Sequence, residues 1–198
     1  VWFANFPMNL QRLRNDLIAI GLLGLVVFLG ISLFSYDPAD PPSEQIYPAR
    51  DHVGNLAGET GAAVSRALRT TLGWGAYLLW GQLLLIDLRL FSRKPLNDWM
   101  ARGFGTALIL SSVCIGLQAA GPAWDQGTVL GSGGFVGAYG LPLMQRYFRP
   151  EGLMVILGSV FLAGVLMSSD TISRGLAFNV LHLPRRLFEK NPVVEEKR

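Results

Sequence analysis

The residue best placed to do chemistry in this 198-residue chain is a serine between two glycines. Gly131-Ser132-Gly133 superficially resembles the nucleophile segment of an intramembrane serine protease, where a histidine at membrane depth would deprotonate the serine. Both histidines, His52 and His182, lie outside the long apolar runs of the chain. We therefore interpret Ser132 as a flexible loop residue, and the two histidines as too isolated to be metal ligands.

Other signatures of catalysis and transport are missing from the sequence. The pattern Gly-x4-Gly-Lys-Ser/Thr, which binds nucleotide phosphates, does not occur. The single cysteine, Cys114, excludes an intrachain disulfide and a cysteine metal cluster, and its apolar neighbours indicate a small buried side chain. Within the apolar runs only Gln82, Gln118 and small hydroxyls are polar, which favours hydrogen bonds between helices over an ion path. Asp87 is the nearest candidate for a functional charge, and we expect it at the headgroup level near Arg89, Arg93 or Lys94.

The chain has too many apolar residues (51%) and too few charged ones (16%) for a soluble domain of this size. Because a helix rises about 1.5 Å per residue, ~20 residues cross a ~30 Å hydrocarbon layer. Four apolar runs approach that length, and no amphipathic helices remain to cover a soluble core built from them. The sequence therefore predicts an all-α integral membrane protein with four transmembrane helices, at about residues 17–36, 70–90, 103–124 and 152–169.

The distribution of lysine and arginine predicts the orientation. If both termini lie on one side, that side carries twelve basic residues and the opposite side five, which places both termini in the cytoplasm. Residues 1–16 are then a cytoplasmic segment, residues 17–170 the four-helix domain, and residues 171–198 a basic amphipathic segment and the start of a linker that something should follow. The basic residues expected on an anionic membrane surface are Arg174, Arg185, Arg186 and Lys190.

A set of small residues recurs at an offset of 76: Gly58, Gly61 and Ala62 match Gly134, Gly137 and Ala138. Each set precedes a span that runs from outside to inside, which predicts two tandem helical hairpins in the same orientation. Residues 54–69 are predicted to form a short helix at the surface or half-way into the bilayer. Since small residues let membrane helices approach closely, we expect close helix packing at Gly21, Gly24, Gly158 and Gly164.

The end of the first run carries a more specific string. Residues 33–41 are Leu-Phe-Ser-Tyr-Asp-Pro-Ala-Asp-Pro, which closely resembles the motif that opens the first external loop of FtsK/SpoIIIE-type DNA translocases. Residues 55–62, 73–79 and 133–137 also resemble that family, and the resemblance covers about residues 10–170. The residues that match the family motif are Ser35, Tyr36, Asp37, Pro38, Asp40 and Pro41.

The resemblance implies a membrane anchor in the bacterial inner membrane. In that family a four-helix domain tethers a hexameric, ATP-driven DNA pump at the division septum and contacts other division proteins. The motor would follow residue 198, so the resemblance implies no catalytic residue, cofactor or DNA contact in this chain, and ATP and Mg²⁺ only in the missing motor domain. The expected partners are the bilayer, other division proteins and further copies of the chain. The loop Tyr36–Tyr47 is either a partner surface or a solvated connector.

Two other functions stay open from the sequence alone. One is a small channel or transporter subunit, for which the absence of charges inside the spans is unfavourable. The other is an intramembrane enzyme, for which no reaction centre is found. The reading frame beyond Arg198 distinguishes them from the anchor: a Gly-x4-Gly-Lys-Ser/Thr motif a few hundred residues downstream favours the anchor, and an early stop codon favours a standalone module.

Overall fold

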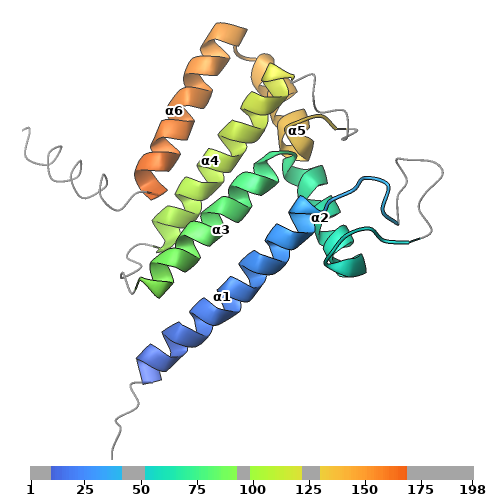
Figure 1. The fold of residues 1–198 in the computed structure, drawn as a ribbon. Coiled ribbons are helices and arrows are strands. Elements are labelled where there is room, and N and C mark those ends of the chain that lie inside the picture. Colours follow the sequence, from blue (N-terminus) through green and yellow to red (C-terminus); the bar gives the residue numbers. More distant parts are fainter. Residues whose placement is uncertain (1–9, 42–51, 93–98, 122–129, 169–198) are drawn as a thin grey trace, which may run out of the picture.

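The computed structural model describes residues 10–41, 52–92, 99–121 and 130–168. Within these ranges the chain forms helices and connecting turns and no strand, so the all-α class is confirmed for the described part. The helices are α1 (Leu10–Phe34), α2 (Gly58–Leu72), α3 (Gly75–Phe91), α4 (Trp99–Ala120), α5 (Gly134–Gln145) and α6 (Pro150–Ser168) (Figure 1).

The four longer helices follow one another in space in the order α1, α3, α4, α6, and the short α2 and α5 lie together at one end (Figure 1). α1 packs on α3 and α4 packs on α6, which makes two antiparallel hairpins. Each hairpin carries a short helix between its two arms, α2 in the first and α5 in the second. The hairpins meet where α3 contacts α4 and where α2 contacts α5.

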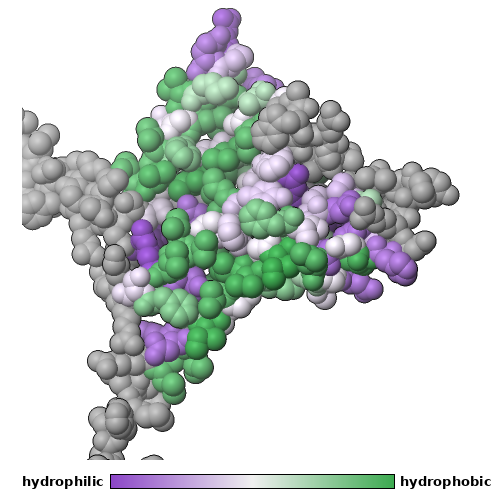
Figure 2. Space-filling model, viewed as in Figure 1, coloured by the Kyte–Doolittle hydropathy of each residue, from purple (hydrophilic) through white to green (hydrophobic). Residues whose placement is uncertain are grey.

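Among the described residues, three helices are long and apolar enough to cross a membrane, namely α1 from Leu13 onward, α4 and α6. Large apolar side chains on them point outward, for example Leu17 (62% exposed), Ile20 (61%) and Val155 (68%). Figure 2 shows that apolar residues cover most of the coloured face, with hydrophilic ones mainly toward its ends. A surface of this kind is unfavourable in water and is typical of helices in hydrocarbon. The chain is therefore a multi-pass membrane protein.

The expected second span, residues 70–90, is divided in the structure. α2 continues to Leu72, the chain turns at Gly73 with φ 58°, and α3 starts at Gly75. Glycine adopts this positive φ at little steric cost, so the apolar run holds a turn that its composition does not reveal. α3 keeps 17 residues, a length of about 26 Å against the ~30 Å hydrocarbon layer.

The first helix extends beyond the predicted span 17–36. α1 begins at Leu10, so residues 10–16 of the predicted cytoplasmic segment are helical and continuous with the span. Arg14 and Asp16 are exposed there, and no glycine or proline interrupts residues 10–20. In Figure 1 this end of α1 extends past the other helices. α4 and α6 lie within a few residues of the predicted spans 103–124 and 152–169.

Candidate functional site

The family motif closes the end of α1. The last carbonyls of a helix lack amide partners, and in a membrane protein they must find other donors. Ser35 Oγ donates a hydrogen bond to Ile31 O (2.6 Å) and accepts one from Leu56 N (3.1 Å). Asn55 Nδ2 donates to Ser32 O (2.9 Å) and to Ser35 O (3.3 Å). Both side chains therefore cap α1 and hold the segment before α2 against it.

Two aromatic side chains of α3 bind the backbone of α1. Tyr77 OH donates a hydrogen bond to Leu33 O (3.0 Å), and Trp80 Nε1 donates to Val26 O (2.9 Å). The indole of Trp80 lies across Gly30, where an added Cβ would come within 2.9 Å of Nε1. Trp80 therefore joins the two helices of the first hairpin.

The aspartates of the motif shape a tight turn and fasten it to α2. Ala39 N donates to Asp37 Oδ1 (2.9 Å), and Asp40 N donates to Asp37 O (3.2 Å). Asp40 is only 1% exposed. Its Oδ1 accepts a hydrogen bond from Gly54 N (2.8 Å), and its backbone carbonyl accepts one from Arg66 Nη2. The motif therefore acts through protein contacts more than through solvent-facing groups.

Arg69 lies among three aromatic rings. Its guanidinium carbon is 4.5 Å from the ring centre of Trp74, 5.6 Å from that of Tyr36 and 5.7 Å from that of Tyr77. The side chain is 5% exposed, so the cation–π attraction acts in a largely desolvated place. Burial raises the pKa of Tyr36 above its usual 10, although the charges of Arg69 and Arg66 oppose the shift, so the phenol stays neutral at physiological pH. We call Ser35–Pro41, Asn55, Arg66, Arg69, Trp74 and Tyr77 the motif corner.

The two halves of the chain touch at what we call the glycine crossing: Gly73, Gly75, Gly133 and Gly134 around Cys114. Trp74 N donates a hydrogen bond to Ser132 O (2.9 Å), and Cys114 Sγ donates to Leu72 O (3.3 Å). A Cβ on Gly75 would lie 2.6 Å from Cys114 Sγ, and one on Gly73 would lie 2.6 Å from Gly134 N. The backbones therefore meet with no space for side chains between them.

Ser132, predicted to be a flexible loop residue, is instead buried and fixed. It is 4% exposed, and its Oγ donates a hydrogen bond to Leu117 O (2.7 Å). Gly133 N donates to Gln118 Oε1 (3.1 Å), which confirms a hydrogen-bonding role for this glutamine. These bonds fasten the segment before α5 to the end of α4, in the way that Asn55 fastens the segment before α2 to the end of α1.

The internal repeat appears in the structure as a repeated unit of a long helix, a short helix and a second long helix. α2 begins at Gly58 and α5 at Gly134, which is the offset of 76 found in the sequence. A Cβ on Gly61 would lie 3.0 Å from Ser32 Oγ of α1, and one on Gly137 would lie 2.6 Å from Cys114 O of α4. In both units a glycine thus lets the short helix pack on the preceding long helix.

One of the four glycines predicted at helix contacts lies at a close approach within the chain. A Cβ on Gly164 would lie 2.8 Å from Gly105 O, and one on Gly105 would lie 2.7 Å from Gly164 O, so α4 and α6 touch through their backbones. At Gly21, Gly24 and Gly158 a Cβ would meet nothing within 4 Å among the described residues. These three are exposed because they point away from the face that their helix buries. Gly105 is the partner that the sequence did not single out.

Asp87, predicted at the headgroup level, lies near the end of α3 and is buried. It is 1% exposed, and its Oδ1 accepts no hydrogen bond from the described residues. Arg102, which directly precedes the predicted span 103–124, belongs to the first turns of α4 and is 8% exposed. In the part of the chain that the structure describes, no three His, Cys, Asp or Glu side chains converge as a metal site would require. The predicted surface residues Arg174, Arg185, Arg186 and Lys190 lie outside the described residues, as do residues 42–51 of the first loop.

Comparisons with known proteins agree with the motif. The family model for the 4TM region of DNA translocase FtsK/SpoIIIE matches residues 11–179. A DNA translocase FtsK from Azospirillum brasilense is 40% identical over 97 residues, which cover 46% of this chain and 15% of that protein. A DNA translocase FtsK from Vibrio vulnificus (strain CMCP6) is 32% identical over 110 residues, which cover 52% of this chain and 11% of that protein. The chain thus matches only a small part of the length of these relatives. No solved structure gives a significant match.

Proposed function

Because this chain belongs to the family of 4TM regions of FtsK/SpoIIIE DNA translocases, we propose that it is the membrane anchor and assembly domain of such a translocase, acting in cell division and chromosome segregation. The observation that carries the proposal is the family match over residues 11–179. The chain performs no catalysis itself and acts by location. Confinement at one membrane raises the effective concentration of a tethered motor near its partners without any new contact.

The proposed topology has four spans, with α3 as the fourth beside α1, α4 and α6. α3 supports this assignment because it lies between α1 and α4 and runs antiparallel to both (Figure 1). The basic residues gather at the end where α3 stops and α4 starts, which favours that end as the cytoplasmic one. Both termini then lie in the cytoplasm, and the motif corner with α2 and α5 lies on the outer side of the bacterial inner membrane.

Other division proteins and further copies of the chain are the proposed partners. Of the loop Tyr36–Tyr47, the structure describes residues 36–41, and these are buried or half-buried in the motif corner. Their hydrogen bonds to Gly54 and Arg66 support a shaping role for them. The motif corner would hold the outer side of the anchor in one conformation for its partners, while any ATP and Mg²⁺ would bind to a motor outside this chain.

Localisation of the isolated chain tests the proposal. The 198 residues fused to a fluorescent protein should gather at the division site although the fusion cannot move DNA. An unrelated four-span membrane protein with the same fluorescent protein is the control, because a septum holds extra membrane and brightens any membrane label. A fusion that is no brighter at the septum than this control would rule out the septal role. Hydrolysis of ATP by the purified chain would contradict the absence of catalysis.

A further inference from the structure

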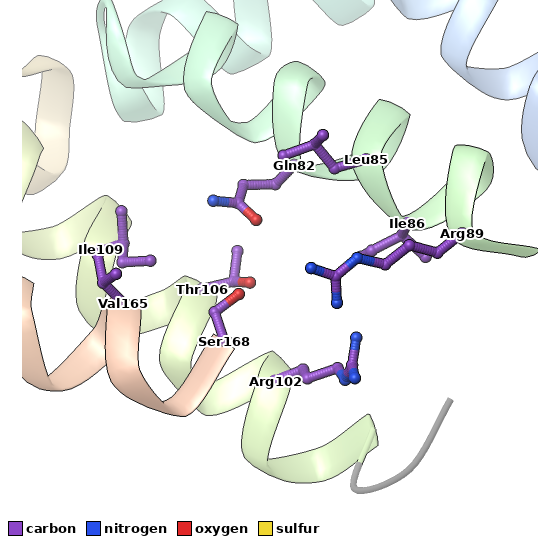
Figure 3. A pocket seen from close by; sticks show the side chains of 9 residues that line it. All are labelled: Gln82, Leu85, Ile86, Arg89, Arg102, Thr106, Ile109, Val165 and Ser168. Atoms are coloured by element: carbon purple, nitrogen blue, oxygen red, sulfur yellow. The ribbon is translucent and has the colours of Figure 1, made fainter. Parts of the chain in front are cut away.

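A cavity lies at the end of the molecule away from the motif corner. Its volume is about 180 Å³, and it lies between α3, α4 and α6 and is partly open (Figure 3). It therefore lies on the joint between the two hairpins. The lining residues are Gln82, Leu85, Ile86, Arg89, Arg102, Thr106, Ile109, Val165 and Ser168.

The polar groups of this cavity suit an anion with several oxygens. The guanidinium groups of Arg89 and Arg102 reach into the same space from α3 and α4, and the hydroxyls of Thr106 and Ser168 and the amide of Gln82 face it as well (Figure 3). Among the lining residues that the structure describes, none is acidic. Guanidinium forks bind phosphate oxygens in pairs, and neighbouring hydroxyls can donate to the oxygens that remain.

The position of Arg102 strengthens this assignment. A long basic side chain at a helix end ordinarily extends toward water with its charge in the solvent. Arg102 instead is 8% exposed, so its charge is held among the helices and directed into the cavity (Figure 3). A phosphate group there could accept charge-assisted hydrogen bonds from a guanidinium that is largely removed from water, where such bonds are strong.

The surroundings point to a lipid as the source of the phosphate. Leu85, Ile86 and Val165 supply apolar wall beside the polar groups. At the same end of α4, Trp99 is 72% exposed, as expected for a tryptophan at a membrane interface. Basic pockets between transmembrane helices on the cytoplasmic side are suited to anionic headgroups. We propose that this cavity binds the phosphate of an anionic phospholipid and that the lipid stabilises the joint between the hairpins.

Thermal unfolding of the purified chain in a neutral detergent tests the proposal. Phosphatidylglycerol should raise the unfolding temperature, and zwitterionic phosphatidylcholine should not. Arg89→Gln should need roughly fivefold more phosphatidylglycerol for the half-maximal rise, which corresponds to about 1 kcal/mol for one basic residue. Arg102→Gln and Thr106→Val should also raise the concentration of phosphatidylglycerol needed for the half-maximal rise. Thr106→Val keeps the test informative if Arg102→Gln does not fold. Arg146→Gln, at an exposed position beyond α5, is the matched control and should behave like the unmodified chain.

The outcomes separate the source of the phosphate from the site itself. An equal rise of the unfolding temperature with phosphatidylcholine would overturn the proposal. Unchanged half-maximal concentrations of phosphatidylglycerol in Arg89→Gln and Thr106→Val would overturn it as well. Inorganic phosphate that reproduced the full rise at the same concentration would keep a phosphate site and overturn the lipid as its source. The result is independent of the septal role, because a chain that binds the lipid in this way can still fail to gather at the septum.

Discussion

Arg69 shows how a single charged residue joins several segments of the motif corner. From the sequence it counts only as one of the five basic residues on the outer side, and its cluster stays hidden because Tyr36, Trp74 and Tyr77 come from different segments. In the structure its guanidinium lies within 6 Å of all three ring centres. It thereby joins the motif, the last turn of α2 and the first turn of α3.

Removing this charge should destabilise the first hairpin. Replacing Arg69 with Gln should lower the free energy of unfolding by about 1–2 kcal/mol, the size of a desolvated cation–π contact. The free energy of unfolding of Arg69→Lys should lie between those of the unmodified chain and Arg69→Gln, because an ammonium keeps the charge but not the planar stacking. Reversible unfolding in detergent measures the difference. Arg149→Gln, at an exposed position, is the control, and an equal loss in both Gln variants would show that the rings contribute nothing specific.

At the scale of elements, the short helices α2 and α5 fasten each hairpin and then fasten the hairpins to each other. Asn55 and Ser132 each bind the end of a long helix, and the glycine crossing joins the two units. Gly73 and Gly134 both have φ 58°, a conformation that an L residue rarely adopts. The joint therefore depends on backbone geometry rather than on side-chain packing.

Adding one methyl group at the crossing should be far more damaging than adding it elsewhere. Gly73→Ala should destabilise the chain by about 2–4 kcal/mol or prevent folding, since its Cβ would meet Ser132 O and Gly134 N at a positive φ. Gly81→Ala, inside α3 with nothing within 4 Å of the new Cβ, should be neutral or gain up to ~1 kcal/mol from helix propensity. Thermal unfolding of the two variants makes the comparison. If both were equally stable, the crossing would not be tightly packed.

The contact between α4 and α6 gives a second matched pair. Gly164→Ala should separate the two backbones and cost about 1–3 kcal/mol. Gly158→Ala lies on the exposed face of the same helix and should have little effect. The yield of folded, monodisperse protein after mild heating in detergent reports the difference. A larger loss for Gly158→Ala would instead point to a partner on that face.

Much of this architecture could be predicted, but only where the pattern is local. Apolar runs reveal the long helices because hydrocarbon tolerates few charges, and the repeat offset gives the first residues of α2 and α5. The turn at Gly73 could not be found, because composition does not carry the sign of φ. The sequence predicted a close contact at Gly164 but not at its partner Gly105, because the face that a helix turns toward its neighbour depends on tertiary packing. The bonds of Asn55 to Ser32 and Ser35 at the end of α1 span 23 and 20 residues of sequence, so they could be found only from the structure.

The whole molecule combines two similar units side by side, so that each long helix runs opposite to the next (Figure 1). The exposed faces are largely apolar. The motif corner and the cavity between α3, α4 and α6 lie toward opposite ends. In the proposed topology, the end with the motif corner faces outward and the end with the cavity lies at the cytoplasmic leaflet. The orientation that follows from it can be checked directly.

Cysteine labelling with a membrane-impermeant maleimide should give opposite results at the two ends. Ser92→Cys, just beyond α3, should react only after the cells are lysed, and Gln145→Cys, at the end of α5, should react in intact spheroplasts. Both positions are exposed, and the native Cys114 is 0% exposed, so it gives a low background without replacement. Efficient labelling of position 92 in intact spheroplasts would contradict cytoplasmic termini.

The bond between Trp74 N and Ser132 O also has a consequence for biosynthesis. The ribosome makes the acceptor about sixty residues after the donor, a delay of roughly three to twelve seconds at 5–20 residues per second. During that interval the first hairpin lacks the contact that completes its motif-corner end, and the Trp74 amide needs water as a substitute partner. Insertion must therefore keep this end hydrated until the second hairpin arrives, so the newly made chain passes through a half-built state that the finished anchor no longer shows.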